Sequence, residues 1–169
     1  AQALNKMTSL PIQVKWPNDL HVKGRKLAGI LCEAKFELDR MQTLVFGLGM
    51  NVNQAAKSLP GDLRTPATTL RSLLGEPATI HPLTIIVLKA VLDGYQDCQQ
   101  PGSGKRLQKE FAPVDALLGQ TITTQNGPVK TQGTARGIDE TGNLRLERPD
   151  KSILIVPAGD VTLEKQSES

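Results

Sequence analysis

The stretch from Thr43 to Asn53 constrains the fold more than any other part of the chain. Every second residue is apolar, a period typical of a β-strand. The apolar set is Leu44, Phe46, Leu48, Met50 and Val52, and the alternate set is Thr43, Val45, Gly47, Gly49, Asn51 and Asn53. Glycine weakens a strand by roughly 0.5–1 kcal/mol. Two glycines on one face indicate that a ligand or another backbone approaches there, with a bulge or tight sheet packing as the alternative.

A second strand is predicted over Leu27 to Phe36, directly before this one, after a glycine turn at Lys23 to Arg25. One alternating set is apolar throughout: Ala28, Ile30, Cys32, Ala34 and Phe36. The other set changes from leucine and glycine to charged residues halfway along. We therefore expect one face to be core along its whole length and the other to emerge into water.

Helices are predicted further along. Thr68 to Leu74 ends at Gly75, and Pro82 opens a long apolar-rich segment that runs to about Cys98. Apolar residues occupy nearly the whole circumference of this segment, which favours a buried core helix. A shorter helix is expected over Arg106 to Phe111.

The helical period disappears after Leu118 and Gly119, and a second, all-β region begins. Asn126-Gly127 is a strong two-residue hairpin signal. The predicted strands are Thr121 to Gln125, Val129 to Ile138, Asn143 to Glu147, Ser152 to Val156 and Val161 to Glu164. The fold class we expect is α+β: a sheet with packed helices over residues 1–117, then a small SH3-like β-barrel domain over residues 118–165, with residues 166–169 as a disordered tail.

The composition argues against several classes of function. The chain has 169 residues and a formal charge of +3, and its purely apolar runs, such as Ile153 to Val156, are too short for a membrane span. Its basic residues are dispersed and its aromatic residues few, which argues against nucleic-acid binding. Cys32 and Cys98 stand far apart without a CxxC motif, so a reducing cytoplasm fits better than a disulfide or zinc framework. The start at Ala1 has no initiator methionine or signal layout, and the chain is expected to be clipped.

Two short strings carry residue types that chemistry needs. Lys15 to Leu20 reads KWPNDL and places a cation, a large aromatic, an amide and a carboxylate in one turn. It is either a binding corner or a structural turn with a buried tryptophan and an aspartate that caps backbone amides. In the second string, Gly24 to Leu31, Lys26 opens a strand and Gly29 follows three residues later. We expect the two strings to form adjacent hairpin elements.

With Gly47 to Asn53 as a third string, the sequence resembles the biotin protein ligases, the biotin-[acetyl-CoA-carboxylase] ligase and biotin operon repressor family. The strings occur in the family's order, and Arg136 to Asp139 and Gly159 to Leu163 are similar to family patterns. The resemblance implies activation of biotin by ATP and Mg²⁺ to biotinyl-5′-AMP, then transfer of biotin to a lysine of a carboxylase's carrier domain. It also implies a cytoplasmic protein that can form a homodimer, with DNA binding only if a further N-terminal domain exists.

The resemblance also implies roles for individual residues. Lys26 is expected to be the catalytic cation that neutralises the biotin carboxylate and the α-phosphate, a charge that phosphoryl transfer requires. Without the resemblance, an exposed hairpin lysine would be assigned to solvent. The expected biotin-binding residues are Lys26, Gly29, Ile30, Leu31 and Gly47, with the backbone of Gly29 to Leu31 facing the ligand.

The ATP side of the site is expected on polar residues, because an amide can both donate to and accept from a base edge. The expected ATP-binding residues are Lys15, Asn18, Asp19, Lys26, Asn51 and Asp160. Asn51 matches the residue that reads adenine. Asp19 is a candidate Mg²⁺ contact, although a turn-capping role is equally open, and Lys15 could instead pair with an acid.

Two departures from the family matter. Its GRGRxG-type loop, expected upstream of Ala1, is not in this sequence, so the chain alone is expected to be weakly active or inactive. Glu164 stands where some relatives carry an arginine, which puts that contact in doubt. Two alternatives stay open: a lipoate-type ligase, and a non-catalytic module for carrier binding or dimerisation.

Overall fold

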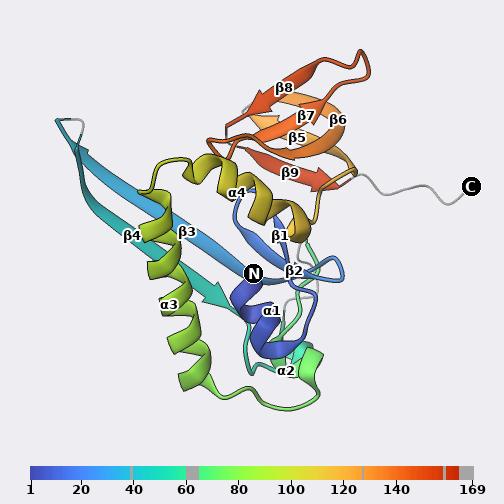
Figure 1. The fold of residues 1–169 in the computed structure, drawn as a ribbon. Helices are drawn as coiled ribbons and strands as arrows, with labels where there is room; N and C mark the ends of the chain where they lie inside the picture. The colour runs from blue at the N-terminus through green and yellow to red at the C-terminus, as the bar shows by residue number, and fades with distance from the viewer. Residues whose placement is uncertain (39, 60–64, 127, 158, 164–169) are drawn as a thin grey trace, which may run out of the picture. The chain divides into compact units, whose positions relative to one another are not determined.

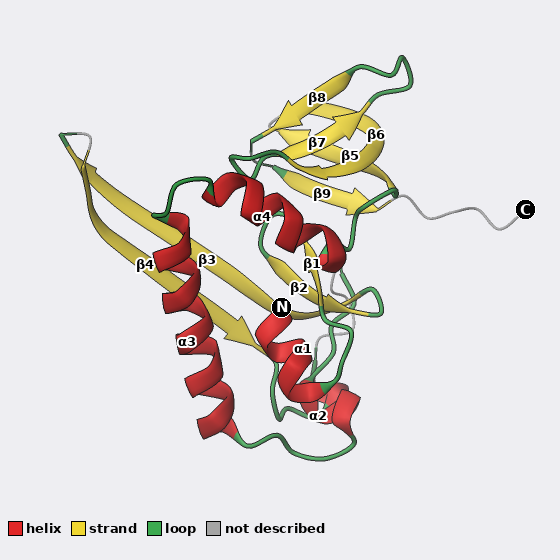
Figure 2. Cartoon of the chain, viewed as in Figure 1, coloured by secondary structure: helices red, strands yellow, loops and turns green. Residues whose placement is uncertain are grey.

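The computed structural model describes residues 1–38, 40–59, 65–126, 128–157 and 159–163. The chain forms two compact units: residues 1–13 with 18–88, and residues 14–17 with 89–169 (Figures 1 and 2). This division falls inside a helix and differs from the boundary expected at residues 117–118, which stays a prediction. Among the described residues, no helix is both long and apolar enough to span a membrane.

The first unit is built on an antiparallel hairpin of two long strands. In chain order the elements are α1 (Gln2–Thr8), β1 (Gln13–Lys15), β2 (Asp19–Val22), β3 (Arg25–Glu37), β4 (Arg40–Met50), η1 (Ala56–Ser58) and α2 (Leu70–Leu74), followed by α3 (Ile80–Cys98). The division between the units crosses β1 after Gln13 and α3 after Leu88. The sheet has the order β1-β2-β3-β4. Its buried apolar side chains include Leu4, Ile12, Leu20, Val22, Leu27, Ala28 and Leu70.

The two predicted strands are confirmed. They pair as an antiparallel hairpin, whose register brings the two apolar sets onto one face. Ile30 pairs with Leu48, and Cys32 with Phe46. The expectation that this face is core throughout is wrong, because Cys32 is exposed and Phe46 is 38% exposed. The far end of the hairpin extends beyond the other elements of its unit (Figure 1), so the described part of that unit leaves it uncovered.

The prediction of a buried α3 is wrong in the same way. The helix has the predicted extent, and Gly75 ends α2 as expected, in a left-handed conformation. In α3 Leu83 is buried, whereas Ile85 is 66% exposed and Leu92 is 61% exposed. A helix that is apolar on all sides needs packing neighbours on all sides. The described residues cover α3 only around Leu83.

The second unit is a five-stranded antiparallel sheet preceded by short helices. Its elements are α4 (Ser103–Phe111), η2 (Ala112–Val114), β5 (Thr121–Asn126), β6 (Val129–Ile138), β7 (Leu144–Glu147), β8 (Ile153–Val156) and β9 (Asp160–Leu163). The predicted strands are confirmed to within about a residue. In the order β8-β7-β6-β5-β9 the outer strands do not pair over their described residues, so the sheet is open where a closed barrel was expected. Gly127, Glu164 and the tail lie outside the described residues.

Trp16 of the KWPNDL string belongs to the core of this second unit. Its side chain is 5% exposed and packs in the cluster that contains Leu117, Ile122 and Leu146. Its indole Nε1 donates a hydrogen bond to the Gly142 carbonyl at 3.0 Å. A buried indole with a satisfied N–H is a structural anchor, so the string combines this anchor with the polar residues that follow it.

Asp115 is a buried carboxylate in the same unit. Its Oδ1 accepts a hydrogen bond from the Leu117 amide at 2.8 Å, and its buried Oδ2 has no partner among the described residues. Burial raises the pKa of Asp115, against the opposing hydrogen bonds from the Leu117 and Leu118 amides. A raised folded-state pKa means that the fold binds the proton more tightly than the unfolded chain, so this group's contribution to stability falls as pH rises from the ordinary carboxyl range.

We therefore expect Asp115→Asn to raise the free energy of unfolding at neutral pH by about 1 kcal/mol. The gain should shrink as pH falls into the ordinary carboxyl range, because the raised pKa lets the wild-type carboxyl take up its proton before the unfolded chain does. Urea unfolding at several pH values measures this, with the exposed Asp93→Asn as the matched control. An equal loss of stability at every pH would show instead that ionised Asp115 is needed.

Candidate functional site

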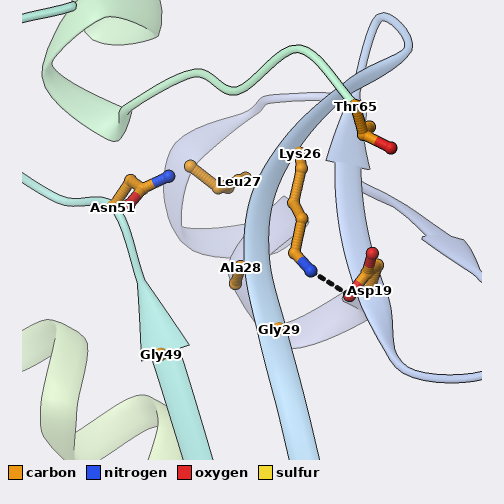
Figure 3. Close-up of a pocket in the computed structure, with 8 residues that line it drawn as sticks. All are labelled: Asp19, Lys26, Leu27, Ala28, Gly29, Gly49, Asn51 and Thr65. Atoms are coloured by element: carbon orange, nitrogen blue, oxygen red, sulfur yellow. Dashed lines mark ion pairs between the residues drawn. The ribbon is translucent and has the colours of Figure 1, made fainter. Parts of the chain in front are cut away.

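A cavity of about 410 Å³ lies in the first unit, within the size range of small-molecule pockets. Figure 3 shows the residues that line it: Asp19, Lys26, Leu27, Ala28, Gly29, Gly49, Asn51 and Thr65. They come from β2, from β3, from the end of β4 and from the segment before α2. The cavity is thus lined by Lys26, Gly29 and Asn51, which were expected to be site residues and come from separate sequence strings.

An ion pair between Lys26 and Asp19 lies in this cavity. The Nζ of Lys26 is 2.6 Å from Oδ1 of Asp19, and the side chains are 40% and 19% exposed, respectively. Such a short pair fixes the direction of the ammonium group. Partial exposure leaves the remaining ammonium hydrogens able to reach a ligand.

A β-bulge makes this pairing possible. Strict alternation would put Lys26 and Gly29 on opposite faces of β3. The register changes between Leu20, which pairs with Ala28, and His21, which pairs with Lys26, so Leu27 is an extra residue in β3. The bulge turns Lys26 onto the face of Gly29 and Asp19.

Two glycines keep this face of the hairpin open. Gly29 and Gly49 lie directly opposite each other on β3 and β4. A Cβ atom at Gly49 would meet no atom within 4 Å, and one at Gly29 would lie 3.4 Å from the Nζ of Lys26. Tight packing against another backbone does not explain Gly49, so approach of a ligand is the better interpretation.

The backbones of Lys26 and Asn51 are held by one segment, residues 66–71. The Lys26 amide donates to the Pro66 carbonyl at 2.8 Å, and the Thr68 amide donates to the Lys26 carbonyl at 2.9 Å. At the start of α2, the Leu70 amide donates to the Asn51 carbonyl at 2.9 Å. This segment positions the cation and the amide without using their side chains.

Asn18 has a backbone role in this structure. Its Nδ2 donates to the Ile30 carbonyl at 2.8 Å, and the Ile30 amide donates to the Asn18 carbonyl at 2.8 Å. Asn18 therefore fixes the strand that carries Gly29. These hydrogen bonds occupy the Ile30 groups that were expected to face a ligand, and neither residue lines the cavity.

The other expected site residues lie outside the cavity lining. Leu31, which is 59% exposed, pairs with Gly47. This pair lies two residues further along the hairpin than the pair of Gly29 and Gly49, on the same face. Lys15 belongs to β1, and Asp160 begins β9 in the second unit. Their proposed contacts with biotin and ATP stay predictions.

We expect Asp19→Asn to release the Lys26 ammonium and to weaken anionic ligands about tenfold, because a neutral amide holds the cation less firmly. The free energy of unfolding should change by less than about 1 kcal/mol, since the pair is partly exposed. Calorimetric titration and thermal unfolding measure the two effects, with Asp97→Asn as a control from an ion pair outside this cavity. Tighter anion binding in Asp19→Asn would show that the carboxylate only repels the ligand.

Known protein families match both ends of the chain. Residues 1–51 match the model of the biotin/lipoate A/B protein ligase family, and residues 117–163 match that of the biotin protein ligase C terminal domain. The chain belongs to the biotin protein ligase family. The description of the second model names biotin protein ligases alone, whereas that of the first also names lipoate ligases.

Individual relatives agree with this membership. The chain is 28% identical over 96% of its length to the bifunctional ligase/repressor BirA of Bacillus subtilis, covering 49% of that protein. It is 30% identical over 89% of its length to the biotin-[acetyl-CoA-carboxylase] ligase of Paracoccus denitrificans, covering 62%. The biotin protein ligase of Aquifex aeolicus, solved in complex with biotin and ATP, has a TM-score of 0.79 at 25% identity, covering 96% of this chain and 66% of that one. The chain thus spans about half to two thirds of these relatives.

Proposed function

We propose that the whole protein is a biotin protein ligase that forms biotinyl-5′-AMP and transfers biotin to a lysine of a carboxylase's carrier domain. One observation carries the proposal: Lys26 and Asn51 line the same cavity, over a floor of two facing glycines. The Aquifex aeolicus relative, with which this fold superimposes, was solved with biotin and ATP bound. In this proposal the chain supplies the part of the site around Lys26.

The first step joins two anions. A carboxylate oxygen of biotin attacks the α-phosphorus of ATP, the new P–O bond forms, and pyrophosphate leaves with the electrons of the bond that breaks. Negative charge accumulates on the α-phosphoryl oxygens in the transition state, where a fixed cation stabilises it most. Lys26 fills this role, because Asp19 orients its ammonium before any ligand arrives.

The second step consumes the mixed anhydride. The neutral amine of the acceptor lysine attacks the acyl carbon, an amide bond forms, and AMP leaves as the amine loses its proton. The same ammonium that stabilised the first step can stabilise the departing phosphate. Leu27 and Ala28 are buried apolar lining residues that keep water from one wall of the cavity.

Mg²⁺ fits this site as an ion that arrives with the nucleotide. Among the described residues, no group of three or more His, Cys, Asp or Glu side chains could hold a metal ion. Mg²⁺ in nucleotide sites is commonly held by one or two carboxylates and by the phosphates, and it supplies positive charge to them. Among the described residues that line the cavity, Asp19 is the one carboxylate, and its Oδ1 is already paired with Lys26.

Calorimetric titration of the whole protein with biotin, ATP and Mg²⁺ tests the proposal. We expect biotin to bind, and pyrophosphate to be released only when biotin and ATP are both present. Failure to bind biotin would refute it. Competition between biotin and lipoate tests the alternative of a lipoate-type ligase. The match of residues 117–163 to a biotin protein ligase domain argues against that alternative. The carrier partner, a homodimer and a cytoplasmic location remain parts of the proposal.

A further inference from the structure

Thr69 is a buried polar residue outside the cavity lining, in the segment of residues 66–71 that holds the cavity. Its side chain forms the N-cap of α2. The hydroxyl oxygen accepts a hydrogen bond from the Ser72 amide at 3.1 Å and lies 2.8 Å from the Ser72 hydroxyl. Burial of a hydroxyl is costly unless it is hydrogen-bonded, so these two contacts explain why Thr69 can be fully buried.

The first amides of α2 hold the end of the strand that carries Asn51. A helix leaves its first N–H groups without partners inside the helix. The Leu70 amide donates to the Asn51 carbonyl, and the Arg71 amide donates to the carbonyl of Val52, each at 2.9 Å. The next amide donates to the Thr69 hydroxyl. Two of these three amides thus hold the strand end, and the third depends on Thr69.

The residues just before Thr69 hold the backbone of Lys26. The Lys26 amide donates to the Pro66 carbonyl at 2.8 Å, and its carbonyl accepts from the Thr68 amide at 2.9 Å. A parallel bridge between Lys26 and Ala67 continues this contact. The hydrogen bonds to Lys26 therefore lie on one side of Thr69 in the chain, and those to the end of β4 lie on the other.

One short segment thus supports both ends of the cavity. Figure 3 shows Lys26 and Asn51 on opposite sides of the β3 ribbon, and the chain that follows Thr65 crosses from one side to the other. Loss of the Thr69 hydroxyl leaves the third amide of α2 without this acceptor, and an uncapped helix start is less stable. The hydrogen bonds on either side of Thr69 then loosen together.

We propose that Thr69 is a positioning residue that fixes Lys26 and Asn51 relative to each other. The proposal rests on the function proposed above, in which Lys26 meets the anionic groups and Asn51 meets the base of ATP. Thr69 itself touches neither substrate. A residue that contacts one substrate affects that substrate most, whereas a change at Thr69 should affect biotin and ATP together.

The test measures KM for biotin and for ATP in pyrophosphate exchange by the whole protein. Thr69→Val keeps the shape of the side chain and removes the hydroxyl. It should raise both KM values several-fold, up to about tenfold, because only molecules with the segment in place are competent. Thr69→Ser keeps the hydroxyl and should behave like the wild type. Asn51→Ala is the comparison for one end of the cavity and should raise KM for ATP alone.

Ser72→Ala is the matched control for the cap. It removes only the contact between the two hydroxyls and keeps the amide that donates to Thr69. Both KM values should therefore stay at the wild-type level.

Hydrogen exchange of single amides separates positioning from a general loss of stability. Thr69→Val should speed the exchange of the Lys26 and Leu70 amides, whose hydrogen bonds lie on either side of Thr69. It should leave the Ile30 amide unchanged, because that amide donates to the Asn18 carbonyl at another point of β3.

The outcomes separate the inference from the function. If Thr69→Val raises only one KM value or neither, the positioning role is refuted, and the proposed function stands on the activity of the wild type. Equal acceleration of all three amides, or of none, would also refute the role of Thr69. If the wild type shows no pyrophosphate exchange that depends on biotin and ATP, the proposed function fails and the inference fails with it.

Discussion

Replacing Lys26 with methionine is expected to lower the rate of biotin adenylation in the whole protein by a factor of about 10²–10³, the usual loss when one preorganised transition-state donor is removed. Methionine keeps most of the length of the side chain and removes the charge. Asp19 would then lie in the cavity without its lysine partner, and its negative charge would add repulsion to the loss. Biotin- and ATP-dependent exchange of labelled pyrophosphate measures the first step.

Lys35→Met is the matched control for this prediction. Lys35 is exposed on the same strand and lies outside the cavity lining, so its replacement should leave the exchange rate unchanged. Lys26→Arg should retain part of the activity, because guanidinium keeps the charge but presents it in a planar fork. An exchange rate within threefold of wild type in Lys26→Met would remove the lysine from the mechanism.

The bulge at Leu27 shows why this site was only partly predictable from the sequence. The alternation of Leu27 to Phe36 and Thr43 to Asn53 predicted the two strands and the apolar set of each, although not their pairing or their exposure. It could not show that Leu27 is an extra residue in the pairing with β2. The family resemblance pointed to Lys26, but the sequence pattern gave no reason for its side chain to face Gly29 and Asp19.

Long-range contacts explain the residues that were missed. Thr65 reaches the cavity because the segment after it pairs with Lys26, roughly forty positions earlier in the chain, and no local pattern encodes that bridge. For α3 the sequence predicted too much burial, because apolar residues occupy most of its circumference but many of them are exposed. A sequence shows which side chains favour burial, but it does not show which other segment packs against them.

Gly49→Val is expected to separate ligand binding from stability. Glycine inside a strand costs roughly 0.5–1 kcal/mol, and valine is among the strongest strand formers. Because a Cβ atom at Gly49 meets no atom within 4 Å, valine can be added without displacing the fold. The free energy of unfolding should therefore stay the same or rise by about 0.5–1 kcal/mol.

Ligand affinity should change in the opposite direction. The valine side chain would project into the cavity, which Gly49 lines opposite Gly29. Overpacking of about 1–3 kcal/mol corresponds to roughly 5- to 150-fold weaker binding. Calorimetry with biotin and with AMP, beside urea unfolding, measures both quantities. Cys32→Val is the control, since it adds a β-branched residue to the opposite face of β3 and should leave affinity unchanged. If Gly49→Val binds both ligands normally, the cavity between the two glycines is not where they bind, and the assignment of Lys26 to their anionic groups fails with it.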